Sequence, residues 1–69
     1  IAPKDPSDIH VGDVVSYQLG DVTVIHRVIE TGTDMDGWYA IVKGDNNPFA
    51  DPDKVRFDQV RRILIAVIY

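Results

Sequence analysis

The stretch GDVVSYQLGDVTVIHRVIE, residues 12–30, decides the fold of this chain. It contains two runs rich in β-branched residues, 14–18 and 22–30, on either side of Gly20-Asp21. A Gly-Asp pair between two such runs is typical of a two-residue hairpin turn. The stretch therefore predicts two antiparallel strands joined by a tight turn.

The register of this hairpin decides which side chains share a face. A two-residue loop pairs Leu19 with Val22, Tyr17 with Val24 and Val15 with His26. Because successive side chains alternate between faces, the second strand divides into two sets. One face would carry Val22, Val24, His26 and Val28, and the other Thr23, Ile25, Arg27 and Ile29. Ser16 would lie opposite Ile25, on the face away from His26.

The rest of the sequence predicts further strands and polar loops. We expect strands over 38–43 and 60–69, loops over 31–37 and 44–52, and an irregular leading segment over 1–11. Residues 53–58 are ambiguous, with room for one short turn. Together these elements indicate one all-β domain over residues 1–69, a small antiparallel sheet or partial β-barrel.

Composition supports this class and excludes others. The 69 residues include ten Val and eight Ile but only two Leu, which favours strands over helices. No cysteine is present, so disulfides and cysteine-based metal sites are excluded. The net charge of −4 argues against a nucleic-acid partner. No apolar run approaches the roughly 18 residues that a membrane-spanning helix needs.

Three features could carry chemistry, and each also has an ordinary structural interpretation. His26 is either a half-buried histidine with one hydrogen bond or a general base that takes a proton from a hydroxyl nucleophile. The segment KGDNN, residues 43–47, is either a plain turn or part of a site held at a strand end. Asp51 is either a solvated loop carboxylate or the group that orients the histidine.

A metal site is the weaker alternative for the same residues. One histidine and several aspartates could bind a divalent cation, but His10 lies in the leading segment, far in sequence from His26. The chain has no calcium-loop pattern and no glycine-rich phosphate loop. We therefore expect no metal and no cofactor.

In combination, these features resemble a known family. GDVV at 12–15, IHRV at 25–28 and KGDNN at 43–47 follow one another, with Asp51 six residues after Asp45. This order and spacing are similar to the core of type I signal peptidases of the archaeal and endoplasmic-reticulum kind, over roughly residues 8–60. GDVV is a weak signal alone, whereas HRV followed by KGDNN at this distance is a strong one.

The resemblance implies a serine endopeptidase, a hydrolase that removes signal peptides from secretory preproteins. It implies action at the extracytoplasmic side of the cell membrane, or on the lumenal side of the endoplasmic reticulum in a eukaryote. His26 matches the family's histidine base, and Asp45 and Asp51 match its two acids. Which of the two acids contacts the histidine stays open at this point, and one of them could serve the loop instead.

The chain departs from the family pattern at the nucleophile. The family's serine lies in a Ser-Met-x-Pro box near a membrane anchor, and neither Ser7 nor Ser16 stands in such a box. We therefore expect that the chain begins downstream of the nucleophile and anchor, and that it is inactive alone. The alternatives are a non-catalytic β interaction module and an inactive peptidase-like domain. A self-cleaving regulator with a Ser-Lys pair is disfavoured by His26 and the GDNN loop.

Overall fold

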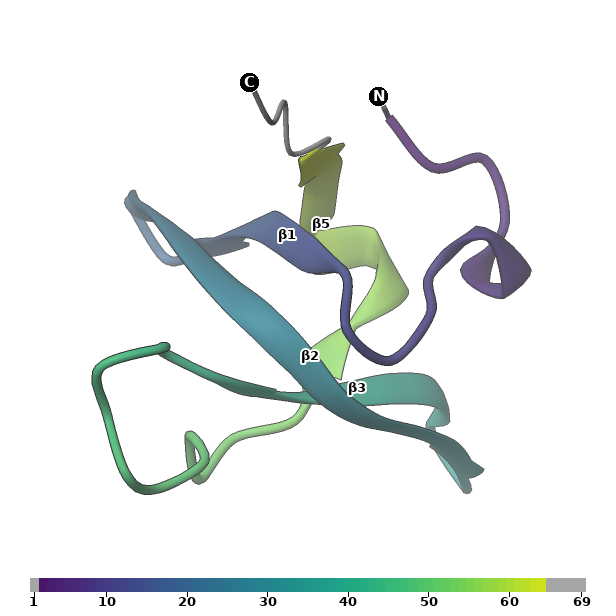
Figure 1. Ribbon diagram of the computed structural model, residues 1–69. Coiled ribbons are helices and arrows are strands. Elements are labelled where there is room, and N and C mark those ends of the chain that lie inside the picture. Colours follow the sequence, from purple (N-terminus) through teal and green to yellow (C-terminus); the bar gives the residue numbers. More distant parts are fainter. Residues whose placement is uncertain (1, 65–69) are drawn as a thin grey trace.

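A computed structural model describes residues 2–64, which form one antiparallel sheet of five strands (Figure 1). The strands are β1 Val14–Leu19, β2 Val22–Asp34, β3 Gly37–Lys43, β4 Val55–Arg56 and β5 Val60–Leu64, in the spatial order β4-β3-β2-β1-β5. Two single-turn 3-10 helices, η1 Pro6–Asp8 and η2 Phe57–Gln59, complete the regular structure. The predicted all-β class is confirmed. Neither helical turn in the described part of the chain is long and apolar enough to cross a membrane.

The β1–β2 hairpin has the predicted register. Leu19 pairs with Val22 and Val15 with His26, and Gly20 takes the left-handed conformation of the turn at φ 61°. Between residues 24 and 29 of β2, the side chains on the predicted inner face are less exposed than their neighbours on the other face, and Val28 is fully buried. Ser16 lies opposite Ile25 as expected, and therefore on the face away from His26.

The prediction of a polar loop over residues 31–37 was wrong. β2 continues to Asp34, where it pairs with Gly37, and the hairpin loop is only Met35-Asp36. The threonines of this stretch are good strand residues despite their polarity. The carboxylate of Asp34 accepts hydrogen bonds from Arg56 of β4 and from Lys54 just before β4, so a charged residue can occupy the last position of β2.

The later part of the chain differs from expectation in detail. The ambiguous residues 53–58 hold a short strand, β4, and the start of η2. The strand expected over 60–69 is seen as Val60–Leu64, and residues 65–69 lie outside the described part of the chain. Within β5, Val60 is buried, whereas Arg61 and Arg62 are exposed.

The sheet curls because its two edge strands are linked by a very short connection. β4 ends at Arg56 and β5 begins at Val60, four residues later, although they lie at opposite edges. Four residues span at most about 14 Å. The edges of a flat five-stranded sheet would lie about 19 Å apart. The sheet is therefore bent toward a partial barrel.

The core lies on the inner face of this curled sheet. Val15, Val28 and Val42 are completely buried and come from the three neighbouring strands β1, β2 and β3. The other buried apolar residues are Ile9, Tyr17, Ala40, Val55 and Val60. The core is thin, as expected for a chain of this length, and it supports β2, which carries His26, and β3, which leads into the loop with Asp45 and Asp51.

A cluster of charges ties the far end of the β2–β3 hairpin to β4. The Asp34 carboxylate accepts hydrogen bonds from Arg56 Nη1 at 2.8 Å and Nη2 at 3.1 Å, and from Lys54 Nζ at 2.8 Å. These hydrogen bonds hold the pKa of Asp34 well below its usual value, and those from Arg56 have the largest effect.

We predict that this cluster makes the stability of the chain depend on pH. Because the folded-state pKa of Asp34 is depressed, its contribution is fully present above the unfolded-state pKa of about 3.9 and is lost progressively as pH falls from there through the lower folded-state pKa. Asp34→Asn should therefore lower the Tm at pH 7 and lower it less at about pH 3. Thermal unfolding followed by circular dichroism measures both values. An equal Tm difference at the two pH values would contradict the prediction.

Candidate functional site

His26 and Asp51, two of the three predicted site residues, are in direct contact. His26 Nδ1 lies 2.7 Å from Asp51 Oδ2, and about a quarter of each side chain is exposed. The hydroxyl of Tyr17 donates a hydrogen bond of 3.0 Å to the same carboxylate oxygen. The site therefore joins two neighbouring strands, β1 and β2, to the long loop between β3 and β4.

Backbone contacts bring Asp51 back to the sheet from this long loop. The loop leaves β3 after Lys43, swings outward and returns to β4 (Figure 1). Asp51 N donates to the carbonyl of Val42 at 2.9 Å, which attaches the residue to the end of β3. At the start of the loop, Asn47 N donates to Gly44 O at 3.0 Å and Lys43 Nζ to Asn47 O at 2.8 Å. These bonds fix the loop on both sides of its outward part.

The contact with Asp51 decides which nitrogen of His26 is available for chemistry. An ionised carboxylate can only accept, so Nδ1 must carry a proton to make the 2.7 Å hydrogen bond. In the neutral imidazole, Nε2 then keeps its lone pair. That nitrogen lies close to Gly44, where an added Cβ would be only 3.2 Å from it. The arrangement presents a basic nitrogen at the start of the KGDNN segment.

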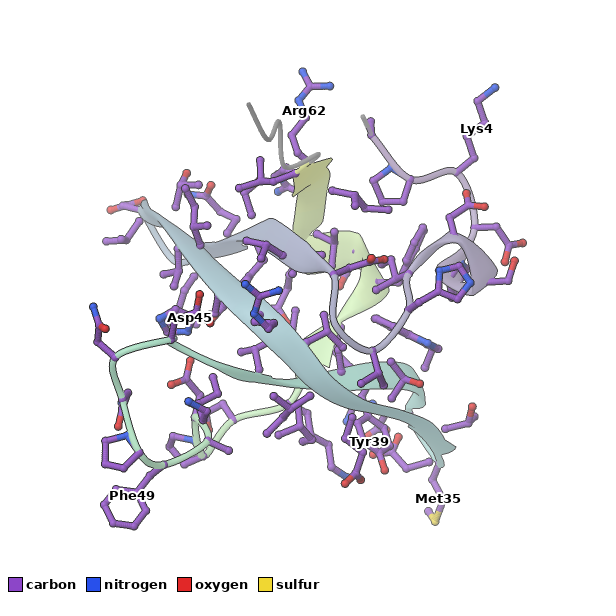
Figure 2. The ribbon with its side chains drawn as sticks, in the orientation of Figure 1. Lys4, Met35, Tyr39, Asp45, Phe49 and Arg62 are labelled. Carbon is purple, nitrogen blue, oxygen red and sulfur yellow. The ribbon has the colours of Figure 1, made fainter. Side chains whose placement is uncertain are left out.

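Asp45, the third predicted site residue, binds a different partner. Its carboxylate accepts from Arg27 Nε at 3.0 Å and Nη2 at 3.2 Å, and Arg27 also donates to the carbonyl of Gly12. The hydrogen bonds and charge of Arg27 lower the pKa of Asp45. Figure 2 shows Asp45 where the chain leaves β3. The structure thus brings His26 together with Asp51, and Asp45 together with Arg27.

Tyr17 was not among the predicted site residues. It is 3% exposed, and its ring packs edge-on against the imidazole of His26, with the ring centroids 6.2 Å apart. The predicted hairpin register was enough to place Tyr17 beside His26. Tyr17 lies two residues from Val15, the partner of His26, so it shares the inner face with the histidine.

A pocket of about 270 Å³ opens beside the paired side chains. His26 and Asp51 form part of its wall, and the apolar part is contributed by Leu19, Val24, Pro52 and Val55. A partly apolar cavity with a few convergent polar groups is typical of a binding site. Within residues 2–64, no group of three or more His, Asp or Glu side chains is placed to hold a metal ion. The wall of the pocket thus places an imidazole and a carboxylate in direct contact.

Comparison with known proteins gives a partial similarity to signal peptidase. Over 54 residues, 74% of this chain and 29% of the relative, the sequence is 41% identical to the signal peptidase complex catalytic subunit of Plasmodium falciparum. Over 44 residues, 64% of this chain and 22% of the relative, it is 46% identical to an uncharacterized protein of Methanocaldococcus jannaschii.

The similarity is signal-peptidase-like. The chain spans less than a third of the length of either of these curated relatives. No family model matches the sequence, and no solved structure matches it. The name of the first relative describes it as the catalytic subunit of a signal peptidase complex.

We predict that Gly44→Ala disturbs the site without unfolding the chain. The new Cβ would lie 3.2 Å from His26 Nε2 and 3.4 Å from Cδ2, so the ring or the loop must shift by a few tenths of an ångström. The ring resonances of His26 should move in a ¹H–¹³C NMR spectrum, while those of the exposed His10 stay in place as an internal control. Unchanged His26 resonances would show that the ring does not lie against Gly44.

Proposed function

We propose that this chain is the part of a signal-peptidase catalytic core that carries the general base and its supporting acid. The observation that carries the proposal is the 2.7 Å contact between His26 Nδ1 and Asp51 Oδ2 beside a pocket. The similarity to a signal peptidase catalytic subunit supports the reaction class. The reaction is hydrolysis of a peptide bond in a secretory preprotein, which releases its signal peptide.

The proposed mechanism uses the two nitrogens of His26 in different ways. A serine hydroxyl attacks the scissile carbonyl and transfers its proton to Nε2 as the new C–O bond forms. Asp51 keeps the Nδ1 proton in place and stabilises the resulting imidazolium. Nε2–H then protonates the leaving amine as the peptide bond breaks. A water molecule then attacks the acyl carbonyl as it gives a proton to Nε2, and Nε2–H returns that proton to the serine oxygen as the ester bond breaks.

We place the nucleophilic serine outside residues 2–64. Ser16 lies on the opposite face of the sheet from His26, since it pairs with Ile25. Ser7 belongs to η1, where its backbone nitrogen is bound by Asp5. The hydrogen bonds of His26 in the described part of the chain involve Tyr17 and Asp51, and no serine hydroxyl.

The two acids have separate roles in this proposal. Asp51 acts on His26 directly, whereas Asp45 positions the loop through Arg27 on the other side of β2. About two thirds of the Asp45 side chain is exposed, and exposed ion pairs contribute little energy. Asp45 therefore serves the geometry of the site more than its chemistry.

The proposed setting follows from the substrate. Signal peptides are processed where preproteins emerge from a membrane, so we propose that the full-length protein acts at the extracytoplasmic face or in the lumen of the endoplasmic reticulum. Its partners would be secretory preproteins and, through a membrane anchor outside this chain, the lipid bilayer.

Substitution of His26 in the full-length protein tests the mechanism. His26→Ala should reduce preprotein cleavage by about 10²–10⁴-fold, because it removes the general base. Asp51→Asn should cost a similar amount, and Asp45→Asn less than about tenfold. The matched control is His10→Ala, since His10 is an exposed histidine of the leading segment. Cleavage at a near wild-type rate in His26→Ala would overturn the proposed base.

The 69-residue chain itself provides a second test. Without a serine near Nε2, the purified chain should not cleave a signal-peptide substrate in a fluorogenic assay, even at high enzyme concentration. Turnover that is lost in Ser7→Ala or Ser16→Ala would show that the nucleophile lies within this chain.

A further inference from the structure

We propose that Tyr17 is a positioning residue whose hydroxyl holds the Asp51 carboxylate and thereby fixes which nitrogen of His26 carries the proton. The effect on the proton is a property of this chain alone. Its consequence for catalysis rests on the function proposed above.

Three polar atoms from three segments form a closed triangle. His26 Nδ1 lies 2.7 Å and Tyr17 Oη lies 3.0 Å from Asp51 Oδ2, and the third side, Tyr17 Oη to His26 Nδ1, is 3.3 Å. The two shorter sides meet at one carboxylate oxygen. An ionised carboxylate oxygen can accept both hydrogen bonds, one at each lone pair.

This triangle allows only one arrangement of protons while Asp51 is ionised. If Tyr17 donated to Nδ1 instead, Nδ1 would present a lone pair to the carboxylate oxygen at 2.7 Å, and the two would repel. With both donors directed at Oδ2, the 3.3 Å side joins two donors that share an acceptor. By holding the Asp51 carboxylate in this place, the tyrosine favours the form of His26 with its proton on Nδ1 and its lone pair on Nε2.

Tyr17 is suited to this role because it is rigid and stays protonated. Its side chain is buried in β1, whereas Asp51 comes from the long loop between β3 and β4. Burial, together with the hydrogen bond to Asp51, raises the pKa of Tyr17 far above its usual value. The hydroxyl thus remains a donor throughout the neutral and alkaline range, and it gives the loop carboxylate a fixed attachment on the sheet.

Tyr17→Phe tests the proposal in the 69-residue chain, without any need for activity. The substitution removes one oxygen and keeps the ring that packs on His26. Long-range ¹H–¹⁵N spectra at about pH 8.5, where an ordinary imidazole is neutral, distinguish the two tautomers. The wild type should show mainly the Nδ1–H form, and Tyr17→Phe a mixture of both.

Tyr39→Phe is the matched control. Figure 2 shows Tyr39 toward the Met35 end of the β2–β3 hairpin, away from Asp45. Its ring lies against the side chains of Lys54 and Arg56, and the phenylalanine keeps that ring. Tyr39→Phe should therefore leave the His26 tautomer as in the wild type. A tautomer shift of equal size in both variants, or none in Tyr17→Phe, would overturn the proposal.

If Tyr17→Phe does not fold, the wild-type chain supplies the second measurement. A Tyr17 hydroxyl proton bound to Asp51 should exchange slowly enough to be observed, and it should show a nuclear Overhauser effect to the ring of His26. Its absence at low temperature would contradict the triangle.

Kinetics of the full-length protein test the consequence for catalysis. Tyr17→Phe should lower kcat about tenfold with KM unchanged, because one hydrogen bond to a charged group is lost. In an Asp51→Asn background the same change should have almost no further effect, because Tyr17 acts through Asp51. Additive losses in the double variant would show that Tyr17 acts by another route.

These outcomes separate the two proposals. A shifted tautomer in Tyr17→Phe, together with intact cleavage in His26→Ala, would retain the role of Tyr17 and overturn the proposed base. An unchanged tautomer together with lost cleavage in His26→Ala would retain the base and overturn the role of Tyr17.

Discussion

The hydrogen bond between His26 and Asp51 is the contact on which the candidate site depends. It joins residues 25 positions apart, one on a central strand and one on a long loop. Three conditions must hold for it to form. The hairpin register must turn His26 to the inner face, β3 must end beside His26, and the loop must return to the backbone of Val42.

The contact itself does little to hold the fold together. A partly exposed ion pair contributes at most about 1 kcal/mol, whereas burying one valine side chain contributes about 1.5 kcal/mol or more. Val15, Val28 and Val42 lie completely buried on three adjacent strands. Two of these strands carry Tyr17 and His26, and the third fixes the start of the loop. The geometry of the site is thus fixed by the buried core of the strands that carry it, although the hydrogen bonds within the site contribute little to stability.

The sequence was sufficient to predict features that depend on residues close together in the chain. A two-residue turn and side chains that alternate between faces predicted the pairing of Val15 with His26 and the position of Ser16 on the face away from His26. It was insufficient where the outcome depends on contacts distant in sequence. The polar character of residues 31–37 predicted a loop, and only the hydrogen bonds of Asp34 with Lys54 and Arg56 show how a charged residue can end a strand.

The same limit applies to the site. The family resemblance marked both Asp45 and Asp51, but no pattern in the sequence shows which acid reaches the histidine, because a long loop has many possible paths. Tyr17 was within reach of the register argument. What the register does not contain is the position of the Asp51 carboxylate that the hydroxyl binds.

The choice between the two acids follows from the alternation of side chains along β2. His26 and Arg27 are consecutive, so they point to opposite faces of the strand. Asp51 binds His26 and Asp45 binds Arg27, so the loop between β3 and β4 contacts both faces of β2. The guanidinium that binds Asp45 is always charged, whereas the imidazole that binds Asp51 becomes charged when it takes up a proton. In the proposed mechanism, Asp45 would therefore support the loop and Asp51 the histidine base, and this difference arises because their partners are consecutive residues of one strand.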